Sequence, residues 1–149
     1  MQIRRADASD SQLLAQLNHQ LIRDEGHRNP MSAAELETRM IRWLDGQYEA
    51  HIFSVEGQSV GYVLACNKAE HVYVRQFFIL PEFRRRGLGR SAFQWMLDNV
   101  WKDSDRLRLD VLVGNKGGIA FWRSLGFSDY CLTMEAKTSL KERVSCANE

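Results

Sequence analysis

The fold of this chain depends on the stretch Ile79-Leu80-Pro81-Glu82-Phe83-Arg84-Arg85-Arg86-Gly87-Leu88-Gly89-Arg90. An apolar strand ends at a proline, a basic turn with two glycines follows, and an amphipathic helix begins. Glycine reaches backbone conformations that a Cβ excludes, and the free N–H groups at a helix start attract anions. The stretch therefore predicts a turn that holds a polyphosphate. The alternative is a strand-to-helix turn with a solvated basic surface.

The composition is typical of one soluble domain. The 149 residues are 44% hydrophobic and 26% charged, which is enough for a hydrophobic core. A net charge of +1 indicates neither nucleic acid nor a membrane as a partner. Three widely spaced cysteines contain no Cys-x-x-Cys pair, so we expect no metal site and no disulfide framework. The N-terminus lacks the apolar segment of a signal peptide, and no apolar run approaches the roughly 20 residues of a membrane span, so we expect a cytoplasmic protein.

Periodicity and capping signals predict the elements around the turn. Capping boxes at Ser9/Gln12 and Ser32/Glu35 start two helices that end near Gly26 and Gly46. A third helix follows the glycine turn, and a fourth lies over 119–125. The expected strands lie over 2–6, 48–55, 60–65, 72–80, 107–113 and 127–137.

This element order predicts the fold class. The order β-α-α-β-β-β-α-β-α-β, with one further strand if 127–137 is bent, indicates an α/β fold with a mixed central β-sheet flanked by helices on both faces. We expect one domain over 1–137 and a polar C-terminal tail over 138–149.

Two other phosphate-binding motifs are less consistent with the chain. The segment 87–92 also matches the dinucleotide fingerprint G-x-G-x-x-[G/A], and Asp110 lies at about the spacing of its acidic residue. A hairpin precedes the motif, however, and too little chain follows it for a doubly wound sheet. A Walker A loop is excluded because no Gly-Lys-[Ser/Thr] follows.

Two motifs resemble the GNAT N-acetyltransferase superfamily. Arg84-x-x-Gly87-x-Gly89 after Pro81-Glu82-Phe83 is similar to its motif [Q/R]-x-x-G-x-[G/A]. The segment Asn115-x-x-Gly118-x-x-Phe121-Trp122-x-x-x-Gly126-Phe127 is similar to its later N-x-x-A-x-x-F-Y-x-x-x-G-F motif. Ile3-Arg4 and Asp10 also resemble the family's first strand and helix start. The resemblance covers residues 1–137 in a consistent order and implies the GNAT fold.

The resemblance implies that acetyl-CoA is the acyl donor and that no metal takes part. Its pyrophosphate would lie on the backbone N–H groups of Arg86, Gly87, Leu88, Gly89 and Arg90, with charge from Arg84 and Arg85. The pantetheine arm would pair along Phe78, Ile79 and Leu80, as an added strand does. The backbone N–H of Ile79 would stabilise the developing oxyanion. Asn115 and Trp122 match the family positions that contact the CoA arm.

The catalytic acid and base stay open at this point. Many members use the tyrosine of the F-Y pair as the acid, but this chain has Trp122 there, and an indole N–H cannot serve. Tyr130 or water is the alternative, or the thiolate leaves without assistance. The candidate bases are Glu70 or His71, before the 72–80 strand, and Asp24, Glu25 or His27, at the end of the first helix.

The acceptor is implied to be a primary amine, most simply of a small molecule. Candidate acceptor-binding residues are Asp24, Glu25, His27 and Arg75. The first three lie at the end of the first helix, where carboxylates would attract a cationic amine. Arg75 interrupts an apolar strand and either anchors an acceptor carboxylate or closes an ion pair. Alternatives are a protein lysine or N-terminal acceptor, and a CoA-binding sensor or interaction module without catalysis. The resemblance also allows a homodimer, since many members dimerise.

Overall fold

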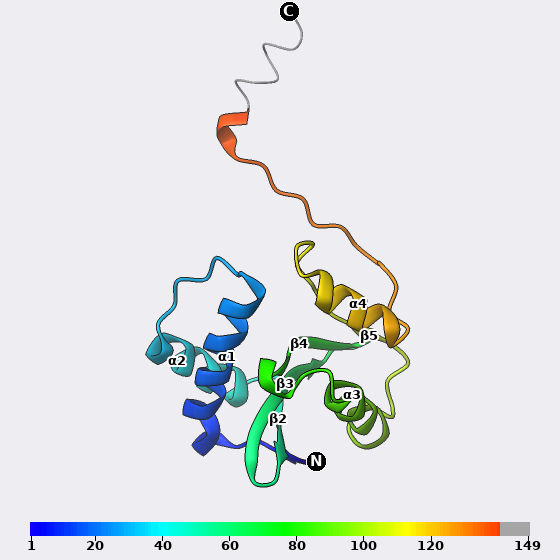
Figure 1. Cartoon of the computed structure of the whole chain (residues 1–149). Coiled ribbons are helices and arrows are strands. Elements are labelled where there is room, and N and C mark those ends of the chain that lie inside the picture. Colours follow the sequence, from blue (N-terminus) through cyan, green and yellow to red (C-terminus); the bar gives the residue numbers. More distant parts are fainter. Residues whose placement is uncertain (141–149) are drawn as a thin grey trace, which may run out of the picture. The chain divides into compact units, whose positions relative to one another are not determined.

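The computed structural model describes residues 1–140 of the chain. The chain forms two compact units, Met1–Lys116 and the residues from Gly117 onward. The first unit has the strands and helices β1 (Gln2–Arg5), α1 (Ser11–Glu25), α2 (Ala33–Asp45), β2 (Tyr48–Val55), β3 (Gln58–Asn67), β4 (Val72–Ile79), α3 (Leu88–Asn99) and β5 (Leu107–Arg108), with short 3-10 turns at Ala8–Asp10 and Pro81–Phe83 (Figure 1).

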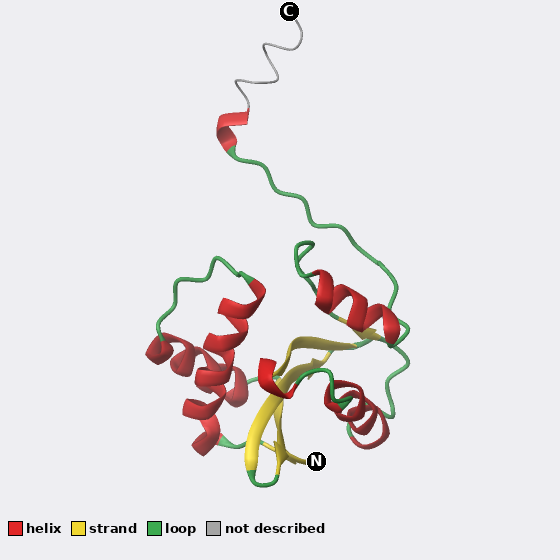
Figure 2. Cartoon of the chain, in the orientation of Figure 1, coloured by secondary structure: helices red, strands yellow, loops and turns green. Residues whose placement is uncertain are grey.

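The five strands of the first unit form one mixed sheet in the order β1-β2-β3-β4-β5 (Figure 2). The first four pair antiparallel, and β5 pairs parallel with β4. The β2–β3 hairpin turns at Glu56 and Gly57, which have φ of 50° and 79°. Two successive positive φ values are typical of the tight turns that match the twist of the strands. The mixed sheet confirms the predicted α/β fold.

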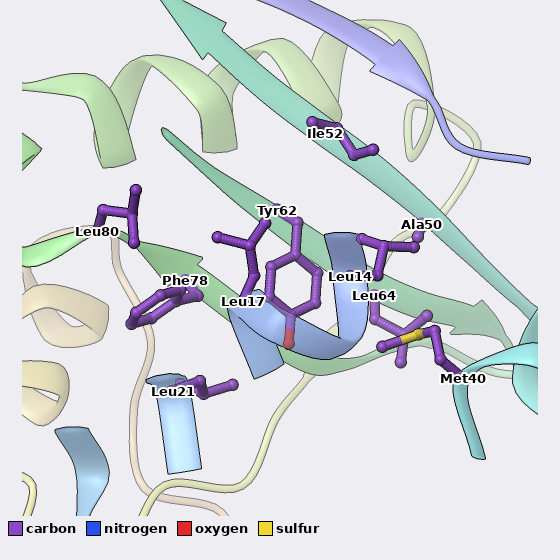
Figure 3. Close-up of a cluster of buried hydrophobic side chains, with 10 residues drawn as sticks. All are labelled: Leu14, Leu17, Leu21, Met40, Ala50, Ile52, Tyr62, Leu64, Phe78 and Leu80. Carbon is purple, nitrogen blue, oxygen red and sulfur yellow. The ribbon is translucent and has the colours of Figure 1, made fainter. Parts of the chain in front are cut away.

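Helices cover both faces of this sheet. Side chains alternate between the two faces of a strand, and on one face a buried cluster packs against α1 and α2 (Figure 3). Its members are Leu14, Leu17, Leu21, Met40, Ala50, Ile52, Tyr62, Leu64, Phe78 and Leu80. On the other face, His51 and Ala65 line a small cavity with Met96 and Trp101 at α3. The sheet is therefore fixed from both sides, which holds the C-terminal end of β4 in place.

The helix ends follow local chemistry, with one correction. Ser32 and Glu35 form the predicted capping box of α2, and Gly26 ends α1 in a left-handed conformation with φ 69°. The predicted Ser9/Gln12 box is wrong, because Asp7 and Asp10 form the box at the preceding 3-10 turn. Asp10 accepts hydrogen bonds from Asp7 N at 2.9 Å and from Arg4 at 2.7 and 2.8 Å. Its carboxylate therefore fixes the helix start to β1.

Two predicted strands are shorter or absent among the described residues. The strand over 107–113 is limited to Leu107 and Arg108, because the chain pairs with β4 at Val72 and Tyr73 only. The segment 127–137 forms no strand, and its apolar side chains Tyr130, Leu132 and Met134 are exposed. An alternating sequence indicates a strand tendency, but a strand also needs a neighbouring backbone for its hydrogen bonds.

The second unit contains all of α4 (Lys116–Ser124) except its first residue, and a 3-10 turn at Thr138–Leu140. The Trp122 ring packs on Phe121 and Phe127 with ring centroids 5.0 and 5.3 Å apart. Most of the expected tail over 138–149 lies outside the described residues.

Candidate active site

The C-terminal half of β4 has one edge that β5 does not cover. The β4–β5 ladder stops at Tyr73, whereas β4 continues to Ile79. Leu80 N–H donates to Val60 O at 2.8 Å, so the backbones of Leu80 and, by alternation, Phe78 are directed toward β3. The intervening Ile79 therefore directs its N–H and C=O toward the opposite edge, away from β3.

The turn after β4 is shaped by left-handed residues. Arg85 and Gly87 have φ of 63° and 75°, and such values are rare for a residue with a Cβ. Gly87 is the N-cap of α3 and provides no side-chain cap. The first N–H groups of a helix have no acceptor within the helix, so those of Leu88 and Gly89 are available to an anion. Gly89 itself lies in the first turn of α3 without a positive φ.

Arg84 holds three segments together. Its Nε donates to Ile79 O at 2.8 Å, and its Nη2 contacts Asp24 Oδ2 at 2.7 Å. The guanidinium also lies 5.4 Å from the ring centroid of Phe78. The sequence predicts that Arg84 supplies charge to a phosphate, and the structure places that charge on Asp24 at the end of α1. Arg85, Arg86 and Arg90 are the exposed arginines of the turn.

The structure brings the end of α1 toward the end of β4. Arg84 links Asp24 to the carbonyl of Ile79. His27 Nε2 lies 2.8 Å from Glu25 Oε2 just beyond, where Gly26 turns the chain. Glu70 and His71 precede the other end of β4, eight or more residues from Ile79, which corresponds to roughly 25 Å along a strand. Of the candidate bases, those at the end of α1, namely Asp24, Glu25 and His27, thus lie toward the end of β4.

A second group of residues surrounds Arg75, the charged residue of β4. The register of β3 and β4 shifts between Leu64 and Ala65, which pair with Gln76 and Val74, so Arg75 lies at a β-bulge. Its Nη1 donates to Tyr48 Oη at 3.2 Å, and its guanidinium carbon lies 4.5 Å from the Trp43 ring centroid. Sequence reasoning singles out Arg75 but misses Trp43, which is predicted on the buried face of the second helix, and Tyr48, which is predicted at the start of a strand.

Arg39 of α2 lies on the same tryptophan. Its guanidinium carbon is 4.3 Å from the Trp43 ring centroid, and its Nη2 donates to Asn18 Oδ1 at 3.0 Å. Burial, and then the positive charge of Arg75, lower the pKa of the Arg39 guanidinium. The sequence carries no signal for this contact, and the sequence-based prediction includes no role for Arg39.

Two tyrosines of the sheet, the buried Tyr62 and the half-buried Tyr73, stay protonated. Tyr62 donates to Gln76 Oε1 at 2.8 Å, and burial raises the pKa of Tyr62 far above its ordinary value. Tyr73 donates to Asp110 Oδ2 at 2.7 Å, and burial followed by this hydrogen bond raises the pKa of Tyr73. Neither phenol would titrate near neutral pH, so both act as hydrogen-bond donors.

The remaining candidate residues lie after β5. Asn115 is half-buried, and its backbone N–H donates to Leu112 O at 2.9 Å. Trp122 is half-buried among its aromatic neighbours in the second unit, and the Tyr130 side chain is 77% exposed. Within residues 1–140, no group of three or more His, Cys, Asp or Glu side chains could hold a metal ion. Over the same residues, no helix combines the length and apolarity needed to cross a membrane.

Comparison with known proteins places the chain among acetyltransferases. The Acetyltransferase (GNAT) family model matches residues 14–127. An uncharacterized N-acetyltransferase from Methanocaldococcus jannaschii is 34% identical over 98 residues. That alignment covers 59% of this chain and 43% of the relative, so the chain spans less than half the length of this curated relative.

Solved structures share the fold. A protein described as a predicted acetyltransferase with acetyl-CoA, from Clostridium acetobutylicum, matches with a TM-score of 0.73 at 18% identity and covers 95% of this chain and 97% of that one. An aminoglycoside N-acetyltransferase in complex with CoA matches with a TM-score of 0.70 at 19% identity and covers 92% and 93%. At these identities the likeness concerns the fold alone.

Proposed function

This chain belongs to the acetyltransferase (GNAT) family, and we propose that it transfers an acetyl group from acetyl-CoA to a primary amine. The observation that carries the proposal is the edge of β4 that β5 leaves uncovered from residue 74 to Ile79, followed directly by the left-handed turn at Gly87. An edge strand and a cluster of backbone N–H groups are what an amide-bearing arm and a pyrophosphate require.

The residues at the turn suit the diphosphate of CoA. The uncapped start of α3 offers the N–H groups of Leu88 and Gly89, and Arg85 and Arg86 are exposed beside it. Backbone donors are already oriented, so they bind an anion with little loss of side-chain entropy. Arg84 would act indirectly, because its bonds to Asp24 and to Ile79 O fix the turn against β4. Asn115 and Trp122 are proposed contacts of the CoA arm by family resemblance.

Ile79 would activate the acyl group through its backbone. When bound, acetyl-CoA supplies a thioester whose carbonyl can be attacked by an amine. The Ile79 N–H is directed to the open edge of β4, on the side where the arm would pair. A backbone donor on that carbonyl stabilises the negative charge that develops on its oxygen, typically by about 3 kcal/mol.

His27 is the proposed general base. A histidine ring can take up a proton near neutral pH, and Glu25 Oε2 lies 2.8 Å from His27 Nε2, which would orient the ring. The amine must lose a proton, and His27 lies beyond the end of α1 that Arg84 ties to Ile79. The thiolate of CoA must gain a proton as it leaves. Trp122 cannot supply this proton, because its indole N–H is not acidic enough. Tyr130 or water is proposed for that step.

The proposed acceptor is a small molecule. The aminoglycoside N-acetyltransferase that shares the fold is named for a small-molecule amine, which supports this class of acceptor. Transfer to a protein lysine or N-terminus is the alternative within the class. A CoA-binding module without catalysis is the alternative of another class, and the observation that favours it is Trp122 at the family's tyrosine position.

The proposal is tested by incubating the protein with acetyl-CoA and a panel of amines. Free CoA is measured with a thiol reagent, and the acetylated product is identified by mass spectrometry. The variant Gly89→Val tests the role of the turn, because it places a branched side chain in the first turn of α3. Valine is at least as good a helix former as glycine, so the fold should persist while CoA binding is lost. CoA release by the wild type but not by Gly89→Val supports the proposal. Equal CoA affinity in both proteins contradicts the phosphate-binding role of the turn, and binding without turnover favours the module.

A further inference from the structure

The face of the sheet that carries α1 and α2 holds a pair of arginines without a countercharge. Arg39 and Arg75 lie 4.3 and 4.5 Å from the centroid of the same Trp43 ring. Among residues 1–140, neither forms an ion pair with a carboxylate, and Arg39 Nε is buried without a hydrogen-bond partner. The two guanidinium carbons are therefore less than about 9 Å apart, where like charges repel each other, and an anion bound beside them relieves the repulsion.

Three acidic side chains of the first unit have partners of their own. Asp24 is paired with Arg84, and Glu25 with His27. Asp110 accepts the hydroxyl hydrogen of Tyr73. Neither arginine of the pair has an ion-pair partner among residues 1–140, and the Arg75 side chain is exposed to an anion from outside the chain.

The fold also shapes this place for a ligand. The bulge in β4 is where Arg75 departs from regular pairing, and bulges commonly re-aim a side chain beside a functional site. Trp43 and Tyr48, with ring centroids 5.7 Å apart, form an aromatic wall, and the Tyr48 hydroxyl fixes the Arg75 guanidinium at 3.2 Å. A guanidinium that is stacked and hydrogen-bonded in advance loses less entropy when it binds an anion.

The distance to the proposed reaction centre sets the length of the acceptor. Arg75 precedes Ile79 by four residues, which corresponds to roughly 13 Å along a strand. Along α1, Asn18, which holds Arg39, precedes Asp24 by six residues, or roughly 9 Å. The two paths correspond to roughly 13 and 9 Å, which places the arginine pair on the order of 10 Å from the end of β4.

We infer that the arginine pair Arg39–Arg75 on Trp43 binds an anionic group of the acceptor, a carboxylate or a phosphate monoester, at the end remote from the reacting amine. The inference rests on the proposed function for the identity of that amine. The acceptor class is thus an ω-amino acid or an aminoalkyl phosphate, with a chain long enough to join the two places.

Direct binding of the acetylated products tests the inference without turnover or CoA. Isothermal titration compares N-acetyl ω-amino acids of increasing chain length, and the corresponding phosphate monoesters, with neutral N-alkylacetamides of the same length. We expect one anionic series to bind at least tenfold more tightly than its neutral partners at an intermediate chain length. The variant Arg75→Gln should remove that preference, while Arg42→Gln, an exposed arginine of the same α2, should keep it.

Two results would overturn the inference. One is equal affinity of the anionic and neutral series for the wild type, or no binding of either. The other is an anionic preference that survives in Arg75→Gln, whose folding is checked by its thermal unfolding. Comparison of the carboxylate series with the phosphate series identifies which anion the arginine pair binds. Failure of acetyl-CoA to bind in a separate titration would instead contradict the proposed function and leave the anion result unaffected.

Discussion

Replacing Gly61 by alanine tests how closely β3 and β4 approach beside the proposed reaction centre. Gly61 pairs with Ile79 in the β3–β4 ladder. A Cβ at this position would lie 2.1 Å from the carbonyl oxygen of Phe78 and 3.0 Å from Cδ1 of Ile79. The Ile79 side chain can move, but the Phe78 carbonyl belongs to the backbone of a paired strand. The substitution therefore has to displace β4 itself.

The magnitude follows from this overlap. The methyl group is more than 1 Å closer to the Phe78 oxygen than ordinary contact permits, and forcing extra atoms into a packed site typically costs about 1 to 3 kcal/mol. Because a backbone must shift, we expect about 2 to 3 kcal/mol of lost unfolding free energy. For a domain of this size the loss corresponds to a fall in Tm of roughly 6 to 12 °C. The displaced segment contains Ile79, so acetyl-CoA affinity should fall as well.

Urea unfolding followed by circular dichroism measures the loss, and titration with acetyl-CoA measures the affinity. Gly114→Ala is the matched control, because a Cβ there has open space and the residue has no positive φ, so its stability should change by less than about 0.5 kcal/mol. The account of a tight β3–β4 approach is refuted if Gly61→Ala unfolds at the wild-type urea concentration with an unchanged m-value.

Three further predictions concern single side chains. Arg4 holds the pKa of Asp10 below its usual range, so this carboxylate stabilises the fold above the unfolded-state pKa near 3.9, and the contribution disappears as the pH falls through the folded-state pKa. Asp10→Asn should cost about 1 to 2 kcal/mol at pH 7 and nothing at strongly acidic pH, as measured by urea unfolding across pH; a difference that persists in acid would contradict the ion pair. Burial lowers the pKa of His51, so stability should be complete above the unfolded-state pKa near 6.5 and decline below it, and His51→Gln should flatten this decline in thermal unfolding between pH 5 and 8. Trp122→Tyr should keep the fold and raise kcat if protonation of the leaving thiolate limits the rate. An unchanged kcat in this variant would mean that protonation of the thiolate is not rate-limiting.

Elements that depend on local chemistry could be predicted from the sequence. The Ser32/Glu35 capping box, the left-handed end of α1 at Gly26 and the Glu56-Gly57 hairpin turn each depend on residues within a few positions of one another. The Gly87 turn is of the same kind, since its φ of 75° requires a residue without a Cβ. Such signals are read directly because neighbouring residues alone satisfy them.

Elements that depend on distant partners could not be predicted from the sequence. The strand tendency of 107–113 is realised at two residues, since the chain pairs with β4 only there. Arg84 looks like a phosphate ligand in sequence, but its partner Asp24 is sixty residues away. The stacking of Arg39 on Trp43 next to Arg75 likewise joins a helix to a strand whose register is set by a bulge. No spacing rule within the sequence reveals these contacts, because the tertiary fold brings the partners together.

The most direct test of the central claim is the thermal stability of the protein with and without acetyl-CoA, with NAD and ATP as controls. A ligand that binds only the folded state, at a hundred times its dissociation constant, adds about 2.7 kcal/mol of stability. We predict that acetyl-CoA and CoA raise Tm and that NAD and ATP at the same concentration do not. A rise with NAD alone, or no rise with acetyl-CoA, would contradict the assignment of the β4 edge and the Gly87 turn to CoA.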